Sequence, residues 1–150
     1  ADKVLKNPKM DDKIKSDAQI IIARSAIKTN NDAKAKEAYA KLQKIAKGEL
    51  AAEALYYDAY FKNKEAKFEA SNKAVEKYSS TYSGYKYFGA KSLVVMAKNY
   101  YGLKDSFQAT EILQSIIDNF TEFPDVVTEC QTELDKIKAE EAKTNSSVTK

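Results

Sequence analysis

The chain of 150 residues contains no histidine, no tryptophan and a single cysteine. Without histidine, the commonest general base and the commonest neutral metal ligand are both missing. One cysteine cannot form a disulfide within the chain, so cysteine usage leaves the redox compartment open. These absences remove most nucleophile–base pairs and all histidine-containing metal sites. We expect neither a metal ion nor a cofactor.

Residues that form turns are also scarce, with four glycines and two prolines. An all-β fold needs many turns, so this shortage favours helices, and strong helix formers are plentiful. The longest apolar run, residues 18–23, ends at Arg24. It is far shorter than the ~20 residues that span a bilayer. The sequence therefore predicts an all-α protein without a transmembrane segment.

The charges are unevenly distributed along the chain. Residues 1–48 hold 12 basic and 6 acidic residues, whereas residues 103–150 hold 5 and 10. Such a gradient suits head-to-tail contacts or docking to neighbouring segments, but it is equally typical of a solvated surface without a partner. Nucleic acid is not an expected partner, because Arg24 is the only arginine and the lysines alternate with acids.

Hydrophobic periodicity predicts seven helices. They cover about 11–28, 32–47, 50–62, 65–79, two segments of 87–120 on either side of a turn at 102–106, and 124–142. The expected inner face of the first helix consists of Ile14, Ala18, Ile21, Ile22 and Ala26. On the last helix Cys130 lies on an apolar face, which favours a buried structural thiol over a reactive one. Residues 1–10 are a polar segment, typical of a fragment or processed form, and residues 144–150 are expected to be a disordered tail.

Small residues recur at a fixed interval, which indicates an internal repeat. The first series is Ala23, Ala59 and Ala97, spaced by 36 and 38 residues. The second series is Ala35, Ala70 and Ala109, spaced by 35 and 39 residues. A helix pair that repeats at this interval is typical of a helical solenoid. We expect one repeat domain, 11–143, with helix pairs at about 11–47, 49–79 and 84–120 and a capping helix at 124–142.

The pattern of these pairs resembles the tetratricopeptide repeat (TPR) family. The third pair carries the family's bulky, small and aromatic positions in Leu93, Met96, Ala97, Tyr100, Ala109, Leu113 and Ile116. The first pair departs from the pattern at Gln19 and the second at Asp58, and the family's helix-ending proline is absent throughout. The resemblance covers about 14–120 and implies a right-handed α-solenoid of about three TPR-like pairs plus the capping helix.

A narrower likeness concerns residues 54–61 (ALYYDAYF) and 78–120. Together with the polar helix that follows, they are similar to the C-terminal part of large TPR proteins of the Bacteroidetes cell envelope. The likeness implies that the chain is part of a larger bacterial envelope protein, in the periplasm or associated with the outer membrane. Its neighbours would then include further repeats of the same protein.

In TPR arrays, the first helix of each pair lines a concave groove that binds a partner. The resemblance places Arg24, Lys28, Tyr56, Tyr60, Lys91, Lys98 and Tyr101 in that groove. It also places Ile20, Glu53 and Val94 there. Tyrosines supply large rigid contact areas, and lysine and arginine bind carboxylates or stack on rings. Such a groove suits an extended peptide or a partner helix.

The leading hypothesis is a non-catalytic scaffold for protein–protein interaction. Acid pairs such as Asp11/Asp12 lie at helix ends, where capping explains them, and no glycine-rich phosphate loop occurs, so we do not expect an enzyme. Two alternatives remain: a structural capping end of a longer array with binding elsewhere, and an adaptor to acidic membrane surfaces through the basic N-terminal third. A groove requires exposed tyrosines, whereas a capping end requires packed tyrosines and an apolar docking face within residues 1–25.

Overall fold

The computed structural model describes residues 8–149, with side chains from 11 to 145. Its helices are α2 (Pro8–Lys28), α3 (Asp32–Ile45), α4 (Gly48–Lys64), α5 (Phe68–Thr81), α6 (Lys86–Gly102), α7 (Ser106–Asn119) and α8 (Pro124–Thr149). No strand occurs in this part of the chain, and the predicted all-α class is confirmed. Residues 1–7 of the predicted polar segment lie outside the described residues, and α2 already begins at Pro8.

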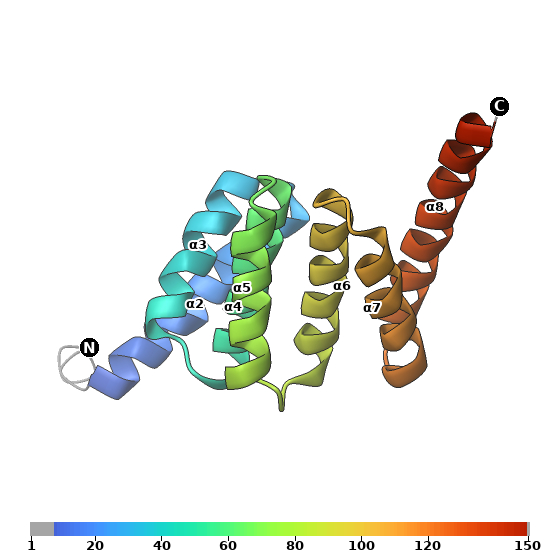
Figure 1. Cartoon of the computed structure of the whole chain (residues 1–150). Coiled ribbons are helices and arrows are strands. Elements are labelled where there is room, and N and C mark those ends of the chain that lie inside the picture. Colours follow the sequence, from blue (N-terminus) through green and yellow to red (C-terminus); the bar gives the residue numbers. More distant parts are fainter. Residues whose placement is uncertain (1–7, 150) are drawn as a thin grey trace.

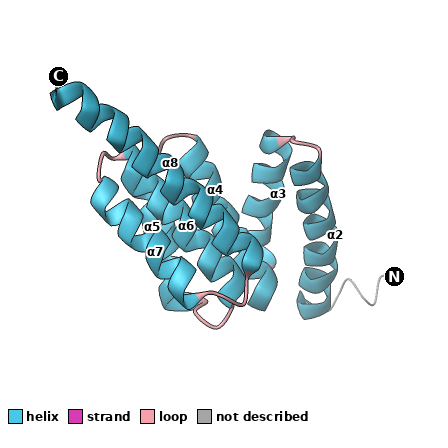
Figure 2. Cartoon of the chain, turned by 90° about the vertical axis from the view of Figure 1, so that its right-hand side faces the viewer, coloured by secondary structure: helices cyan, strands magenta, loops and turns pink. Residues whose placement is uncertain are grey.

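The helices follow one another across the molecule pair by pair, from α2 and α3 at one end to α8 at the other (Figure 1). Three antiparallel hairpins, α2–α3, α4–α5 and α6–α7, are joined by short connections. The second helix of each hairpin packs on the element that follows, and α4 also packs on α6. Figure 2 shows α8 lying along the last hairpin and projecting beyond it.

The turn inside each hairpin has the same backbone conformation. A residue in the left-handed region ends the first helix, at Asn30 (φ 57°), Ala66 (φ 60°) and Lys104 (φ 68°). In each turn the next N–H donates to a carbonyl one helical turn back, from Asn31 to Ala26, Lys67 to Lys62 and Asp105 to Tyr100, at 2.8 Å each. This is the hydrogen bond that closes a Schellman turn. The three left-handed residues are 36 and 38 apart, so the repeat is present in the backbone.

The buried small residues follow the same spacing, with one correction to the sequence prediction. Ala23, Ala59 and Ala97 are almost fully buried, as expected. In the second hairpin the buried small residue is Ser71, and the assignment to Ala70, which is only partly buried, is wrong. The Ser71 hydroxyl donates to the Ala59 carbonyl at 2.7 Å, which satisfies a polar group in this close helix contact.

The predicted inner face of α2 is also wrong. Ile14, Ile21 and Ile22 are 45%, 69% and 38% exposed, and of the predicted face only Ala26 is buried. The other buried side chains among the described residues of the helix are Ser16, Ile20 and Ala23. The helix carries two apolar stripes, and the close packing of the repeated alanine against α3 decides which stripe faces inward. The outer stripe is left in solvent within the described structure.

The last helix is longer than predicted and buries the only cysteine. The sequence predicts an end near 142 and a disordered tail from 144, whereas α8 runs on to Thr149. Cys130 is fully buried among Val126, Leu134 and Ile137, as the apolar face predicts. Burial raises the pKa of its thiol to about 12.

We expect Cys130 to make the fold sensitive to alkaline pH. The unfolded thiol ionises near its ordinary pKa of 9 and the folded thiol only at about 12, so its stabilisation is fully present below pH 9 and is lost as pH rises toward 12. Urea unfolding at pH 8 to 11 measures this loss, and Cys130→Ala should lose less stability over that range. An identical pH dependence in both proteins would contradict the prediction.

Ser92 carries a buried hydroxyl without a partner among the described residues. Its side chain is 1% exposed, and the equivalent residue in the preceding hairpin, 38 positions earlier, is the buried Ala54. Because an unsatisfied buried hydroxyl costs about 1–3 kcal/mol, we expect Ser92→Ala to raise the free energy of unfolding by about 1 kcal/mol.

Ser71→Ala is the matched control for this measurement. It removes a hydroxyl that donates to the Ala59 carbonyl and accepts from the Asn99 amide. Urea unfolding should therefore give opposite signs for the two serine-to-alanine changes. A loss of stability in both variants would show that the Ser92 hydroxyl is satisfied.

Candidate functional site

A groove of about 420 Å³ lies between the first helices of the three hairpins. It is lined by Arg24, Ile27 and Lys28 of α2, Tyr39 of α3, Glu49, Glu53 and Tyr57 of α4, and Tyr87, Phe88 and Lys91 of α6. These residues come together because α4 packs on α6 and the Arg24 side chain of α2 reaches Glu53 of α4. Three of the predicted partner-binding residues, Arg24, Lys28 and Lys91, therefore line one groove.

The side of the groove formed by α2, α3 and α4 is held by a buried carboxylate. Glu53 is 3% exposed and accepts two hydrogen bonds from the Arg24 guanidinium, at 3.1 and 2.7 Å. It also accepts one from the Tyr39 hydroxyl at 2.7 Å. Burial and this hydrogen bond raise the pKa of Tyr39, which keeps the phenol neutral. Arg24 is thus already neutralised and orders the groove wall.

Aromatic rings form most of the remaining wall. Tyr57 stacks on Tyr39 with ring centroids 4.2 Å apart, and burial raises its pKa. On the α6 side, the Lys91 ammonium lies over the rings of Tyr56 and Tyr87, at 5.3 and 5.6 Å from their centroids. A lysine in this position is held by cation–π attraction and forms no direct ion pair among the described residues. The pKa of the Asp125 carboxyl is lowered by its hydrogen bond from Tyr87 and, to a lesser extent, by the charge of Lys91.

The two tyrosines predicted from α4 do not form an exposed groove surface. Tyr56 is 5% exposed and packs against Phe88 behind the groove, so its expected exposure is a correction. Tyr60 is half-buried, between Tyr57 and Phe61, with the Lys64 ammonium 5.0 Å above its ring. Ile20 and Val94, which occupy the equivalent position to Tyr56, are buried as well. This helix position is part of the core.

The predicted residues at the end of α6 face the last helix of the chain. Lys98 pairs with Glu129 at 3.3 Å, and the Tyr101 hydroxyl donates to Glu140. Tyr87 likewise donates to Asp125 of α8 at 2.6 Å. The predicted site is therefore divided. Arg24, Lys28 and Lys91 line the groove, whereas Lys98 and Tyr101 contact α8.

The sequence prediction missed part of the aromatic wall. Tyr57, Tyr87 and Phe88 line the groove, although the family pattern places none of them there. One signal was available, because Tyr87 lies four residues before Lys91 and the two share a helix face. Nothing comparable marks Tyr57, whose place depends on the ring of Tyr39 in the preceding hairpin.

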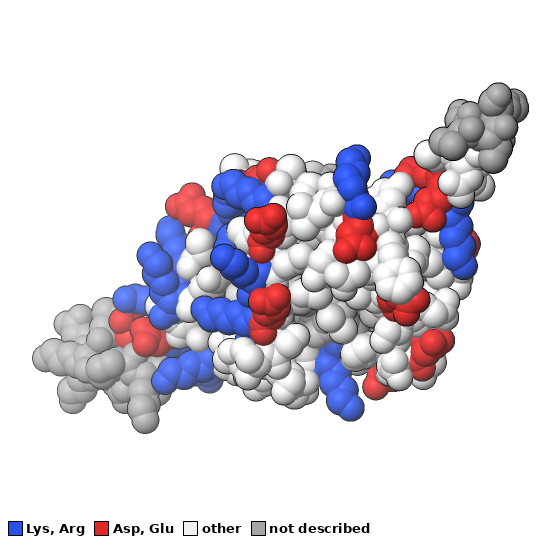
Figure 3. All heavy atoms as spheres, in the orientation of Figure 1, with Lys and Arg blue, Asp and Glu red and all other residues white. Residues whose placement is uncertain are grey.

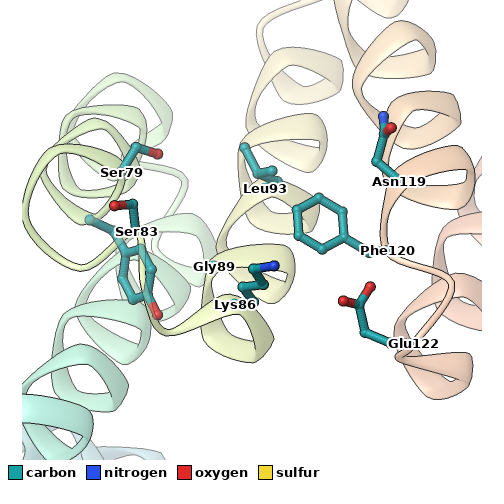
Figure 4. Close-up of a pocket in the computed structure, with 9 residues that line it drawn as sticks. Ser79, Ser83, Lys86, Gly89, Leu93, Asn119, Phe120 and Glu122 are labelled. Carbon is teal, nitrogen blue, oxygen red and sulfur yellow. The ribbon is translucent and has the colours of Figure 1, made fainter.

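A second hollow of about 350 Å³ lies between α5, α6 and α7. Figure 4 shows the ring of Phe120 reaching from the end of α7 toward Leu93 of α6, with Lys86 and Glu122 beside the opening. Its walls are mainly apolar, and Ser79 and Ser83 of the α5 side add hydroxyls. It contains none of the residues predicted to bind a partner.

The charges at the groove and the absence of metal-ligand groups among the described residues limit the functions that the groove could have. Over α2 and α3, Lys and Arg side chains gather on the face shown in Figure 3. The groove itself holds three cations, Arg24, Lys28 and Lys91, against Glu49 and Glu53. Within the described residues, no group of three potential ligands is arranged to hold a metal ion, and no helix is long and apolar enough to cross a membrane.

Comparison with known proteins adds no relative from which a role could be transferred. No protein-family model matches the chain, and no curated protein is significantly similar to it. The functional interpretation therefore rests on the residues and geometry described above.

Proposed function

We propose that the chain is a non-catalytic scaffold, a TPR-like right-handed α-solenoid of three hairpins closed by α8, that binds a protein partner in the groove between α2, α4 and α6. Tyr56 is packed and α2 exposes an apolar face, as expected for a capping end, so the tyrosines alone do not support a groove. The observation that carries this proposal is instead the convergence of Lys28 and Lys91 on an aromatic-walled hollow beside the Arg24–Glu53 pair. The repeated turn conformation and the repeated buried residues support the solenoid. Location in a bacterial envelope remains a proposal that follows from the sequence resemblance alone.

The expected ligand is an extended segment with an acidic side chain next to an aromatic or aliphatic one. Glu53 neutralises Arg24, whereas Lys28 and Lys91 have no ion-pair partner among the described side chains. A carboxylate from the partner would pair with these two lysines, and its apolar neighbour would pack on Tyr57, Tyr87 and Phe88. The rings offer contact area at a low cost in side-chain entropy, because they are already held by their neighbours.

A displayed library of random peptides, selected on the intact chain, tests this function. We expect the enriched peptides to combine Asp or Glu with an aromatic or aliphatic residue. Lys28→Glu/Lys91→Glu should weaken their binding by about tenfold or more, since like charges then meet at the contact. Lys73→Glu, an exposed lysine of α5 outside the groove, is the control and should leave affinity unchanged. Enriched peptides without acids, or equal binding by the double variant, would refute the proposal.

A further inference from the structure

The outer face of α2 is an apolar surface with nothing packed on it among the described residues. We define this α2 face as Ile14, Ala18, Ile21, Ile22 and Ser25, which share one side of the helix. All five are exposed, and Ile21 is 69% exposed. Large exposed aliphatic side chains grouped on one helix face mark an interaction surface more often than isolated ones do.

The equivalent face of α4 shows what covers such a surface. Adding 36 to the positions of Ile14, Ala18, Ile21 and Ser25 gives Leu50, Ala54, Tyr57 and Phe61. These four residues belong to the core cluster that α4 shares with α2 and α3, whereas the equivalent of Ile22 is the partly buried Asp58, which pairs with Lys62 at 2.9 Å. The Tyr57 ring stacks on Tyr39 of α3, and the Ala54 carbonyl accepts a hydrogen bond from Gln43 of α3 at 3.3 Å. On α4, therefore, this face is covered by the second helix of the preceding hairpin.

The same holds for the first helices that follow. A further 38 residues along, the face of α6 consists of Phe88, Ser92, Val95 and Asn99. It packs against α4 and α5, where Ser92 and Asn99 are 1% and 0% exposed. Another 38 residues along, Val126 and Cys130 of α8 pack against the α6–α7 hairpin. The helices α4, α6 and α8 thus bury most of the face that α2 exposes.

From this equivalence we propose that the α2 face is the docking surface for a further antiparallel helical hairpin, whose second helix lies on α2 as α3 lies on α4. The proposal rests on the repeat array proposed above, but it does not depend on binding in the groove. Among the described residues at the other end of the molecule, the exposed side of α8 is mostly polar. Exposed residues there include Thr128, Gln131, Thr132, Asp135, Lys136 and Lys138.

The chemistry of the docking helix follows from its neighbours on α2. Asp17 is equivalent to Glu53, and it is exposed where Glu53 is buried. Since Glu53 accepts the hydroxyl of Tyr39 from α3, the docking helix should present a hydroxyl or cationic donor to Asp17. It should also present aliphatic or small residues to Ile14, Ile21 and Ile22. In a close helix contact, a charged group against these side chains would lose its hydration without gaining a partner.

The α2–α3 hairpin of the chain itself is a suitable probe. Its outer surface already covers Leu50 and Ala54, which are close in size to Ile14 and Ala18, and it carries the donor Tyr39. Joining residues 1–48 directly to a second copy of residues 13–150 inserts one extra hairpin with the natural connection at Gly48. In this tandem chain, the inner copy of the α2 face receives the outer copy of α3.

We expect the tandem chain to unfold in a single transition whose urea m value exceeds that of the parent by roughly one quarter, in proportion to the added buried surface. Ile21→Lys in the inner copy should return the m value of that transition to the parent's. Gln19→Lys in the inner copy adds the same charge on another side of the helix and should leave the increase intact.

The opposite results are equally definite. An m value that never rises, or a rise that survives Ile21→Lys, would overturn the proposal. Sedimentation of the parent chain tests whether a second copy of the chain occupies the α2 face. A dimer that Ile21→Lys converts to a monomer would assign the face to that second copy and would also overturn the proposal. None of these variants changes Lys28 or Lys91. The tandem-chain and sedimentation results therefore do not depend on whether the groove binds a peptide.

Discussion

Asn99→Leu is expected to destabilise the protein by about 3 kcal/mol, because it removes the centre of a buried polar network. The Asn99 side chain is fully buried in α6. Its amide donates to Ser71 and Asn72 of α5 at 2.8 Å each, and its carbonyl accepts from Asn63 of α4 at 2.8 Å. Leucine has a similar volume, so the change tests the hydrogen bonds rather than the packing.

The cost arises from the partners that remain. Without Asn99, the side-chain carbonyl of the buried Asn72 and the amide of the half-buried Asn63 lose their hydrogen bonds, while Ser71 can still donate to Ala59. Urea unfolding monitored by circular dichroism gives the difference in free energy. Asn119→Leu, at an exposed position of α7 whose amide bonds only to Ser115, should change stability by less than about 0.5 kcal/mol. Equal effects at the two positions would contradict the network's role.

The network explains a difference between the hairpins that the sequence does not reveal. The residue equivalent to Asn99 is Phe61 in α4 and Ser25 in α2. At the α4 position an aromatic ring packs into the core of the first hairpin, whereas at the α6 position three polar side chains from α4 and α5 converge. These three residues share no chemical type. They are equivalent only because they occupy the same position on their helices.

Helix order and the approximate repeat were predictable from sequence, because both depend on local spacing. Ala23, Ala59 and Ala97 stand where two helices touch, and only small side chains fit there. The rotation of α2 was not predictable in the same way, since either of its apolar stripes could face inward. Residue type alone favours Ala70 over Ser71, because alanine occupies the equivalent position in the other two hairpins. Burial instead places Ser71 at the intervals of 36 and 38 residues.

The candidate site was predictable only where its residues belong to adjacent first helices. Lys28 and Lys91 line one groove because α4 packs on α6 and the α2–α3 hairpin packs on α4 through α3. Lys98 and Tyr101 were misplaced because α8 approaches α6 from a distance of about 30 to 40 residues in sequence, and its path cannot be read from the pattern of α6. The burial of Tyr56 could not be predicted, because a tyrosine side chain suits both a core and a binding surface.

Gly102→Ala is expected to destabilise the protein by about 2 kcal/mol, although alanine normally favours a helix over glycine by about 1 kcal/mol. Gly102 ends α6, and the first residue of α5, Phe68, lies directly against it. A Cβ atom at Gly102 would lie 2.5, 2.6 and 2.8 Å from three atoms of the Phe68 ring. Contacts this short cannot persist, so the Phe68 ring must shift away from Gly102.

The double variant separates this clash from other effects of the substitution. In a Phe68→Ala background the ring is gone, so Gly102→Ala should become neutral or stabilising as helix propensity takes over. Gly84→Ala is the matched control, since its added Cβ meets no atom within 4 Å, and little change is expected. A destabilisation of similar size with and without the Phe68 ring would refute the clash. A reversal of sign would show that the close approach of Phe68 requires glycine at the end of α6.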